Sequence, residues 1–342
     1  MSRQIEITEK TPLLDENGNL FRPGYCTRNL YIYNREKISA KHRIKEWDFY
    51  QIADERYMLQ LCFADISLGA AGNATLLDLA TGEKFTSQGL VLFPSGKYPL
   101  PKNGDESHNF SFIKGNFSMS FRVGEESRVL KFNGKSKGSP FYGEILLEYG
   151  KEDESLTIAT PFERQGRFFL TQKKNCMTAT GKVVAGGREY EFSPKYGSFG
   201  VLDWGRGVWP HKNLWYWANG STFLDGELFG FELTWGFGSD DFATETALFY
   251  KGKCHKLGRV WLERSPKGRW TEPWVFKEEN GRFNLTMTPF YDHVTGIKIP
   301  PLVGARCHQV HGKWNGTVVL DDGEVLEIKD MYAFCERMEN LW

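Results

Sequence analysis

The stretch Phe110-Ser-Phe-Ile-Lys-Gly-Asn-Phe-Ser-Met-Ser-Phe-Arg-Val123 alternates bulky apolar residues with small or polar ones on both sides of a turn. In a β-strand, every second side chain points to the same face, so this alternation gives each arm one apolar face. The turn is Lys114-Gly115-Asn116, whose glycine accepts the backbone angles that a tight hairpin requires. The stretch predicts a β-hairpin that buries one face.

The same pattern of short alternating runs and turn dipeptides extends along the whole chain. Aromatic residues make up 15% of the chain and 36 residues are glycine, which is typical of antiparallel β structure with few, short helices. Because a closed sheet has no exposed edge strands, we expect closed or nearly closed barrels. Further turns are predicted at Thr81-Gly82, Lys251-Gly252, Asn280-Gly281 and Asp322-Gly323.

Length and one break in the pattern predict two domains. A chain of 342 residues suits one large all-β domain or two moderate ones, and we favour two. The predicted strands Glu144–Tyr149 and Ser155–Ala159 flank a charged loop, and Pro161–Gly166 then interrupts the pattern. We therefore expect one β domain over residues 1–165 and a second over residues 166–342.

Charge and hydropathy limit the classes of partner. Lys and Arg together number 43, as do Asp and Glu, so no general basic field exists to hold a nucleic acid. Residues 1–18 lack the apolar segment of a signal peptide, and no apolar run is long enough to span a bilayer. We expect a cytoplasmic protein that has no membrane span and binds a small molecule. Its oligomeric state stays open.

Cysteines and motifs argue against bound metals and cofactors. The six cysteines are scattered singly, so reduced thiols are expected. In Cys254-His255 and Cys307-His308, adjacent side chains on a strand point to opposite faces and make poor chelates. The chain lacks the glycine-rich loops that bind dinucleotides or nucleoside triphosphates, and it lacks the His-Glu-x-x-His motif of zinc proteases. No metal and no cofactor are expected.

The densest group of chemically useful residues lies in the middle of the chain, in the run Gly200-Val-Leu-Asp-Trp-Gly-Arg-Gly-Val-Trp-Pro210 and just after it. Aromatic groups around the acid would exclude water and favour a protonated carboxyl group, which is a usable general acid. The three glycines would let a ligand approach the backbone closely. A buried Asp–Arg pair beneath an aromatic core is the structural alternative. The candidate residues are Asp203, Trp204, Arg206, Trp209, Trp215 and Trp217.

This region resembles a known family. Leu202-Asp-Trp-Gly205 is similar to the Asp-x-x-Trp-Gly segments of AttH-like proteins, which include the carotenoid 1,2-hydratases (hydroxyneurosporene synthases). Over nearly its whole length, the chain resembles a bacterial family of unknown function that is grouped with those lipocalin-like proteins. The residues that carry the resemblance are Pro12-Leu-Leu14 with Gly18 and Gly24, Lys45-Glu-Trp-Asp-Phe-Tyr50, Asp203-Trp-Gly-Arg-Gly207 with Trp209-Pro210, and His308-Gln309.

The resemblance implies two lipocalin-like antiparallel β-barrels, or strongly curved sandwiches, side by side, with a ligand cavity near Asp203. In the hydratase relatives, an acidic residue near this motif is thought to protonate a carbon–carbon double bond while aromatic groups stabilise the cation. Asp203 and the four tryptophans of this region are expected to reproduce that arrangement. Arg206, three residues away, is expected to favour ionised Asp203 and to weaken it as an acid.

Two further acids are candidates for the same site. Glu245 and Glu336 lie within largely apolar predicted strands, where an unpaired charge is costly. Each is therefore expected either to form a salt bridge or to supply a second carboxyl group beside Asp203, as the acid, base or nucleophile of a hydrolase.

Other polar residues are weaker candidates. His308 and His255 are expected either to orient a ligand and carry a proton or to be ordinary hydrogen-bonded histidines. Gln309, next to His308, is expected to contact the substrate. The polar segment 173–175, Lys-Lys-Asn, is expected to form a solvated face of a strand, with a position on the cavity wall as the alternative.

Two functions from different classes fit these residues. The first is a cofactor-independent enzyme with a pocket at a barrel mouth, where Asp203 handles protons in a hydrolase, lyase, hydratase or isomerase. Its substrate would be apolar or sugar-like, and the nearby charged side chains slightly favour the sugar-like molecule. The second is a non-catalytic carrier of a small molecule, in which Asp203 and Arg206 brace the barrel.

Overall fold

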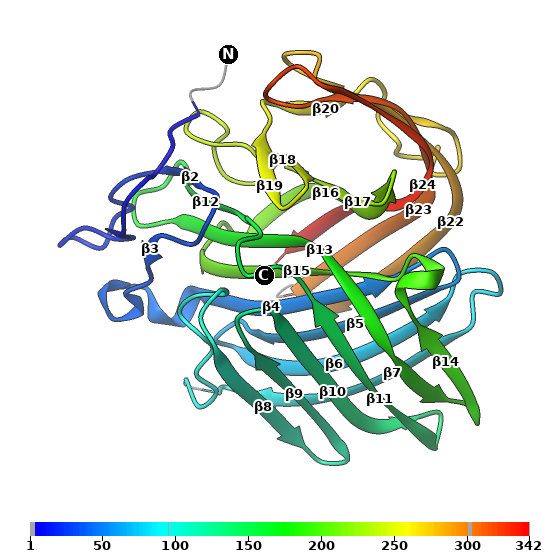
Figure 1. The fold of residues 1–342 in the computed structure, drawn as a ribbon. Helices are drawn as coiled ribbons and strands as arrows, with labels where there is room; N and C mark the ends of the chain where they lie inside the picture. The colour runs from blue at the N-terminus through cyan, green and yellow to red at the C-terminus, as the bar shows by residue number, and fades with distance from the viewer. Residues whose placement is uncertain (1–3, 95, 300–302, 342) are drawn as a thin grey trace.

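The computed structural model describes residues 4–94, 96–299 and 303–341 and contains two large antiparallel sheets, each curled toward a barrel. Figure 1 shows the larger sheet, built from the N-terminal half, below the smaller one. The predicted all-β fold with two barrel-like sheets side by side is confirmed. In the described ranges, the helices are the single 3-10 turns η1 (Arg35–Lys37), η2 (Lys41–Arg43) and η3 (Pro194–Tyr196).

The larger sheet runs through residues 24–208. Its strands lie in the order β7 (Lys84–Leu92), β6 (Gly69–Asp78), β5 (Tyr57–Asp65), β4 (Ile44–Ala53), β15 (Phe199–Val208), β13 (Phe168–Ala185), β11 (Ser139–Glu148), β10 (Ser127–Ser136), β9 (Phe117–Val123) and β8 (His108–Lys114). Strands β12 (Leu156–Pro161) and β14 (Arg188–Phe192) pair with β13, and β2 (Gly24–Cys26) pairs with β12. A separate parallel pair is formed by β1 (Thr11–Pro12) and β3 (Tyr31–Ile32).

The smaller sheet begins at residue 212, and its strands lie in the order β19 (Lys253–Lys256), β18 (Glu245–Tyr250), β17 (Glu227–Trp235), β16 (Lys212–Leu224), β24 (Val325–Leu341), β23 (Val303–Val319), β22 (Phe283–Ile299), β21 (Trp274–Glu278) and β20 (Val260–Leu262). Strands that follow one another in the chain mostly lie side by side, as expected for connected hairpins. All four predicted turn dipeptides lie between paired strands, at the ends of β6, β18, β21 and β23.

The predicted hairpin over residues 110–123 is confirmed. Strands β8 and β9 pair with Phe110 opposite Phe121 and Phe112 opposite Met119, and these four side chains are buried. Phe110 and Phe112 reach across the interior to Phe63 of β5, with ring centroids 4.7 and 5.1 Å apart. Because β5 and β8 lie far apart along the path of the sheet, these contacts show that the larger sheet closes around a shared apolar core.

The chain passes from the larger to the smaller sheet between Val208 and Lys212. The predicted boundary near residue 165 falls instead in the hairpin between β12 and β13, and both of those strands belong to the larger sheet. Pro161–Gly166 is therefore a turn within one sheet. We propose residues 209–211, where the chain changes sheet, as the division between the two parts.

Strand β13 of the larger sheet makes side-chain contacts with the smaller sheet. It carries a bulge between Lys174 and Met177, and Cys176 within the bulge has a positive φ of 58°. There, Asn175 Nδ2 donates to the Phe231 carbonyl of β17 at 2.9 Å. The expectation that segment 173–175 is solvated is wrong, because all three side chains are buried. Lys173 and Asn175 contact the smaller sheet, whereas Lys174 contacts Tyr149 and the Asp153 carbonyl group.

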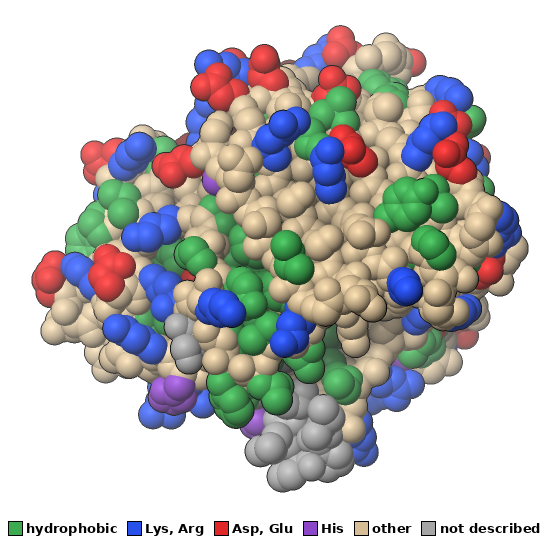
Figure 2. Space-filling view, turned by 90° about the horizontal axis from the view of Figure 1, so that it is seen from below, with side chains coloured by type: hydrophobic (Ala, Val, Ile, Leu, Met, Phe, Trp, Pro, Cys, Tyr) green, Lys and Arg blue, Asp and Glu red, His purple; other side chains and the backbone are tan. Residues whose placement is uncertain are grey.

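The surface carries charges of both signs. Figure 2 shows Lys and Arg side chains interspersed with Asp and Glu side chains on one face, around scattered hydrophobic groups. The exclusion of nucleic acid as a partner stays a prediction, as does the cytoplasmic location. Within the described ranges, no helix has the length and hydropathy needed to cross a membrane. All six cysteines lie in the described residues, and each is a free thiol.

A buried ion pair lies inside the larger barrel. Arg206 is fully buried and its Nη2 atom lies 2.8 Å from the Asp48 carboxylate. The guanidinium also donates to the carbonyl groups of Trp47, Gly205 and Pro101. Neighbouring residues of a strand point to opposite faces, so Arg206 projects into the barrel while Asp203 projects out of it.

The Arg206→Met variant should lose about 3–5 kcal/mol of unfolding free energy, because it leaves the Asp48 carboxylate buried without its partner. Urea denaturation at pH 7 measures this loss. The exposed pair Lys131–Glu144 provides a matched control, and Lys131→Met should cost less than about 1 kcal/mol. Equal losses in the two variants would contradict a structural role for the buried pair.

Candidate active site between the two sheets

A cavity of about 280 Å³ lies between the two sheets, on the faces that each sheet turns away from its own core. It is therefore not at the mouth of one barrel, where the sequence analysis expected it. The wall is mainly aromatic and aliphatic, with a few polar groups, which is the usual composition of a small-molecule site. Its lining residues from the larger sheet and its connections are Lys45, Trp47, Phe49, Gln60, Cys62, Ala64, Ile66, Asp203 and Trp209, and those from the smaller sheet are Trp215, Trp217, His293, Thr295, Cys307, Gln309, Glu336 and Met338.

Strand register arranges several residues on and beside the cavity wall in two rows. On the larger sheet, directly paired positions give the row Lys173, Asp203, Phe49 and Cys62. On the smaller sheet, directly paired positions give the row Trp217, Glu336, Gln309 and His293. Paired positions on neighbouring strands carry side chains on the same face. Each row therefore presents its side chains together on one wall of the cavity.

The ammonium group of Lys173 is the charged centre beside the cavity, on a smaller cavity that adjoins it. Lys173 is only 3% exposed, and its Nζ atom lies 2.9 Å from Asp203 Oδ1 and 3.1 Å from Glu245 Oε1. A third carboxyl group, that of Glu232, lies 4.0 Å away. The Nζ atom also lies 4.5 Å from the ring centroid of Trp217. One buried cation thus connects three acids from two sheets.

This excess of acids over cations sets the protonation of the cluster. Burial lowers the pKa of Lys173, but the carboxylates of Asp203, Glu245 and Glu232 outweigh it and raise that pKa above its ordinary value. Burial raises the pKa values of Glu232 and Glu245. Lys173 does not offset this effect, because a single ammonium cannot balance three buried negative charges. Lys173 therefore stays cationic, and the two glutamates keep their protons to a higher pH than an ordinary glutamate does. Thr171 Oγ1 donates a long hydrogen bond, 3.4 Å, to Asp203.

Glu336 is the second acid of the cavity wall. Its Oε1 atom accepts a hydrogen bond from Trp215 Nε1 at 2.9 Å, and its Oε2 atom accepts a longer one from Gln309 Nε2 at 3.4 Å. Burial raises the pKa of Glu336 to about 7, and the negative charge of Asp203 adds to the shift. A substantial fraction of Glu336 is therefore protonated at neutral pH. Among the described residues, no cation lies in direct contact with it to favour the carboxylate.

Indole rings form the apolar walls beside these acids. Trp47 and Trp209 stack with ring centroids 4.6 Å apart and an interplanar angle of 9°. Gly205 allows this arrangement, because a Cβ atom there would lie 2.4 Å from the Trp47 ring. A Cβ atom at Gly207 would lie 2.4 Å from the Phe168 carbonyl oxygen. The sequence predicted that these glycines let a ligand approach the backbone. Gly205 and Gly207 instead permit close packing within the protein.

The structure brings most of the predicted site residues to this cavity. Glu245 lies beside it, on a smaller adjoining cavity of about 30 Å³ that also contacts Lys173 and Thr234. The predicted residues on the main cavity wall are Asp203, Trp209, Trp215, Trp217, Gln309 and Glu336.

Two residues of the Asp-Trp-Gly-Arg-Gly segment lie elsewhere. Trp204 and Arg206 point into the core of the larger barrel, and the guanidinium carbon lies 4.1 Å from the Trp204 ring centroid. The expected effect of Arg206 on Asp203 is therefore wrong, because Arg206 pairs with Asp48 on the opposite face of β15. The cation beside Asp203 is Lys173 instead.

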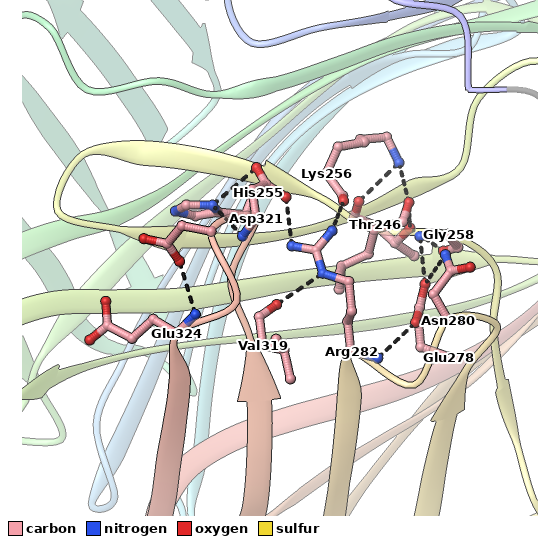
Figure 3. Close-up of polar contacts among 12 residues, drawn as sticks. Thr246, His255, Lys256, Gly258, Glu278, Asn280, Arg282, Val319, Asp321 and Glu324 are labelled. Atoms are coloured by element: carbon pink, nitrogen blue, oxygen red, sulfur yellow. Dashed lines mark hydrogen bonds and ion pairs between the residues drawn. The ribbon is translucent and has the colours of Figure 1, made fainter.

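The two predicted histidines also lie away from the cavity wall. His308 stacks on Trp270 with ring centroids 3.7 Å apart, and its Nδ1 atom lies 2.9 Å from Asp292. Figure 3 shows His255 beside Asp321 at the far end of the smaller sheet, where Arg282 also contacts Asp321. Neither histidine shares the face of the sheet that carries Gln309 and Glu336.

Sequence reasoning missed several residues of the site. Glu232 was missed and Lys173 was expected on a solvated face, because nothing in the local pattern shows that the second sheet covers β13 and that the two residues meet. Trp47 and Phe49 were within reach, since the alternation in Lys45–Tyr50 places them on one face of a strand and Asp48 on the other. In the described ranges, no group of three or more His, Cys, Asp and Glu side chains is arranged to hold a metal ion.

The stability of the protein should depend on the protonation of Glu336. Because its folded pKa is raised to about 7, the neutral form stabilises the fold, and this contribution is lost as the pH rises from about 4.5 through 7. Gln stays neutral at every pH. The unfolding free energy of Glu336→Gln minus that of the wild type should therefore increase by on the order of 3 kcal/mol from pH 5 to pH 8. Urea unfolding at both pH values measures this difference, and a constant difference would contradict the shift.

Comparisons with known proteins place the chain in a family. The family described as "Domain of unknown function (DUF2804)" matches residues 4–342. A search of curated proteins finds no match. Two solved structures are similar at low identity. An AttH-like protein from Nitrosomonas europaea is 13% identical over 90% of this chain and 96% of its own, with a TM-score of 0.47. Kievitone hydratase from Nectria haematococca is 12% identical over 87% and 88%, with a TM-score of 0.44.

The family match covers almost the whole chain, so the predicted membership of a family of unknown function is confirmed. The two structural likenesses are too weak to carry an argument about activity. The chain belongs to the DUF2804 family.

Proposed function

We propose that the protein is a cofactor-independent enzyme that transfers protons to and from a small molecule bound between the two sheets. The observation that carries this proposal is a pair of carboxyl groups in different surroundings on facing walls of one cavity. Asp203 is paired with a buried ammonium group, whereas Glu336 has no cation in contact and a pKa raised to about 7. Two carboxyl groups whose surroundings differ in this way are suited to act as base and acid.

Glu336 is the proposed acid. Its burial favours the protonated form, and a group whose pKa lies near the working pH both holds and gives up a proton efficiently. From the sequence, Asp203 was the main proton-handling group, with Glu245 or Glu336 as the alternative source of a second carboxyl group. In our revised assignment, Asp203 is the base, because Lys173 at 2.9 Å stabilises its carboxylate and 13% of its side chain stays exposed, at the cavity wall.

The reaction that suits this pair is the addition of water to a double bond or the movement of that bond. Glu336 would donate its proton to one carbon atom. Asp203 would then remove a proton either from a water molecule that attacks the other carbon or from the adjacent carbon. The indole groups of Trp47, Trp209 and Trp217 line the cavity and would stabilise the cationic intermediate. Transfer of a proton from Asp203 back to Glu336, through solvent, restores the starting state.

The wall of the cavity favours a substrate with an apolar body. The charged residues that suggested a sugar-like substrate, Arg206, His255 and His308, do not line it. A sugar needs many hydrogen-bonding partners, whereas most of this wall is formed by indole, phenyl and aliphatic groups. We therefore prefer an apolar, unsaturated substrate and no longer favour the sugar.

A non-catalytic carrier remains the second candidate function. The enclosed apolar cavity suits the retention of a small molecule, and the pairing of Asp203 with Lys173 would then serve only to fasten the two sheets. The carrier differs from the enzyme in one measurable respect, because it keeps its ligand unchanged when the acids become amides.

The test is incubation of a metabolite library with the wild type, Asp203→Asn and Glu336→Gln, read by mass spectrometry in water enriched in deuterium and oxygen-18. A hydratase adds one labelled water, an isomerase exchanges hydrogen without other mass change, and a hydrolase cleaves with gain of water. We expect each amide variant to lose about 10²–10⁴-fold in turnover while still binding substrate.

Glu327→Gln is the matched control, because Glu327 lies on β24 like Glu336 but its side chain is exposed and pairs with Lys329. Its turnover should equal that of the wild type. Ligand bound and recovered unchanged from all four proteins would contradict the enzyme and favour the carrier.

A further inference from the structure

One imidazole on the cavity wall has an unused polar atom. His293 is on β22, lines the cavity and is only 6% exposed. Its Nε2 atom is buried and has no hydrogen-bond partner among the residues that the structure describes. An unsatisfied buried polar atom costs about 1–3 kcal/mol, so its presence on the wall of a cavity points to a ligand atom that satisfies it.

The imidazole is uncharged at neutral pH. Burial lowers the pKa of His293 to about 4, with a further contribution from Lys84. A neutral imidazole has one donor nitrogen and one acceptor nitrogen, and which of them is Nε2 depends on the tautomer. A hydroxyl group both donates and accepts, so it satisfies either tautomer. A carboxylate or phosphate gains no ion pair from a neutral ring.

The register places His293 at the opposite end of the row from the charged cluster. Gln309 on β23 separates His293 from Glu336, so two strand spacings of about 4.8 Å, or about 10 Å, divide their backbone positions. The Gln309 side chain is already engaged by Gln51, Gln60 and Glu336. His293 is therefore the polar group offered to a ligand at this end.

We propose that Nε2 of His293 binds a hydroxyl group of the substrate and that the substrate has an apolar body. The hydroxyl group lies about two strand spacings from the atom that Glu336 protonates. This inference rests on the proposed function for the identity of the reacting end. It adds the orientation of the substrate in the cavity.

The test uses two unreactive probes that differ by one hydroxyl group, naphthalene and 2-naphthol. Equilibrium dialysis gives the Kd of each probe for wild type, His293→Leu and His293→Gln. The measured quantity is the ratio of the naphthalene Kd to the 2-naphthol Kd, because it cancels changes in cavity shape. Loss of one hydrogen bond should lower this ratio about 3–10-fold in His293→Leu, with naphthalene binding unchanged. The Gln side chain also donates and accepts, so His293→Gln should keep much of the preference.

His308→Leu is the matched control, since His308 is on the neighbouring strand but points away from the cavity wall, and it should keep the wild-type ratio. Thermal unfolding of each variant verifies the fold. The inference is overturned if the ratio is the same in His293→Leu and wild type, if it falls in Asp203→Asn instead, or if the wild type binds neither probe. Because the probes do not react, this result is independent of the turnover test of Asp203 and Glu336.

Discussion

The ammonium group of Lys173 is the interaction on which the arrangement of the two sheets depends. Lys173 comes from β13 of the larger sheet and contacts Asp203 on the neighbouring strand β15. It also reaches Glu245 and Glu232, which belong to the smaller sheet. A buried charge is tolerated only when it is paired, and Glu245 and Glu232 meet Lys173 only where the two sheets approach each other.

This contact explains why the cavity has two unlike ends. Near Lys173, the walls carry Asp203 and the glutamates that share one cation. Further along the same rows lie Glu336 and then the neutral imidazole of His293, which has no charge partner. The charged end follows from the ammonium group of Lys173, which three carboxyl groups surround. Proton transfer and substrate orientation both use that difference.

Local pattern was sufficient to predict the β-structure. Alternation and turn dipeptides predicted the hairpin of β8 and β9 and four further turns, because strand periodicity and glycine geometry act within a few residues. The break at Pro161–Gly166 was mistaken for a boundary, because a turn inside a sheet and a link between sheets have the same local composition.

The site could be predicted only in part. Asp203 and the tryptophans at positions 209, 215 and 217 were found because they cluster in the sequence, and Glu336 because an acid stood in an apolar strand. The separation of Arg206 from Asp203 was predictable from strand periodicity, since residues three apart point to opposite faces. The burial of Lys173 and its contact with Glu232 were not, because they arise when one sheet docks on the other.

A double-mutant cycle with Lys173→Met and Glu245→Gln tests the central claim most directly. The account predicts that Lys173→Met costs about 3–5 kcal/mol of unfolding free energy, since it leaves the acids of both sheets unpaired. It also predicts that the double variant loses less than the sum of the single losses, by on the order of 1–3 kcal/mol. Losses that add to within about 0.5 kcal/mol would show that the ammonium group does not couple the two sheets and would contradict the account.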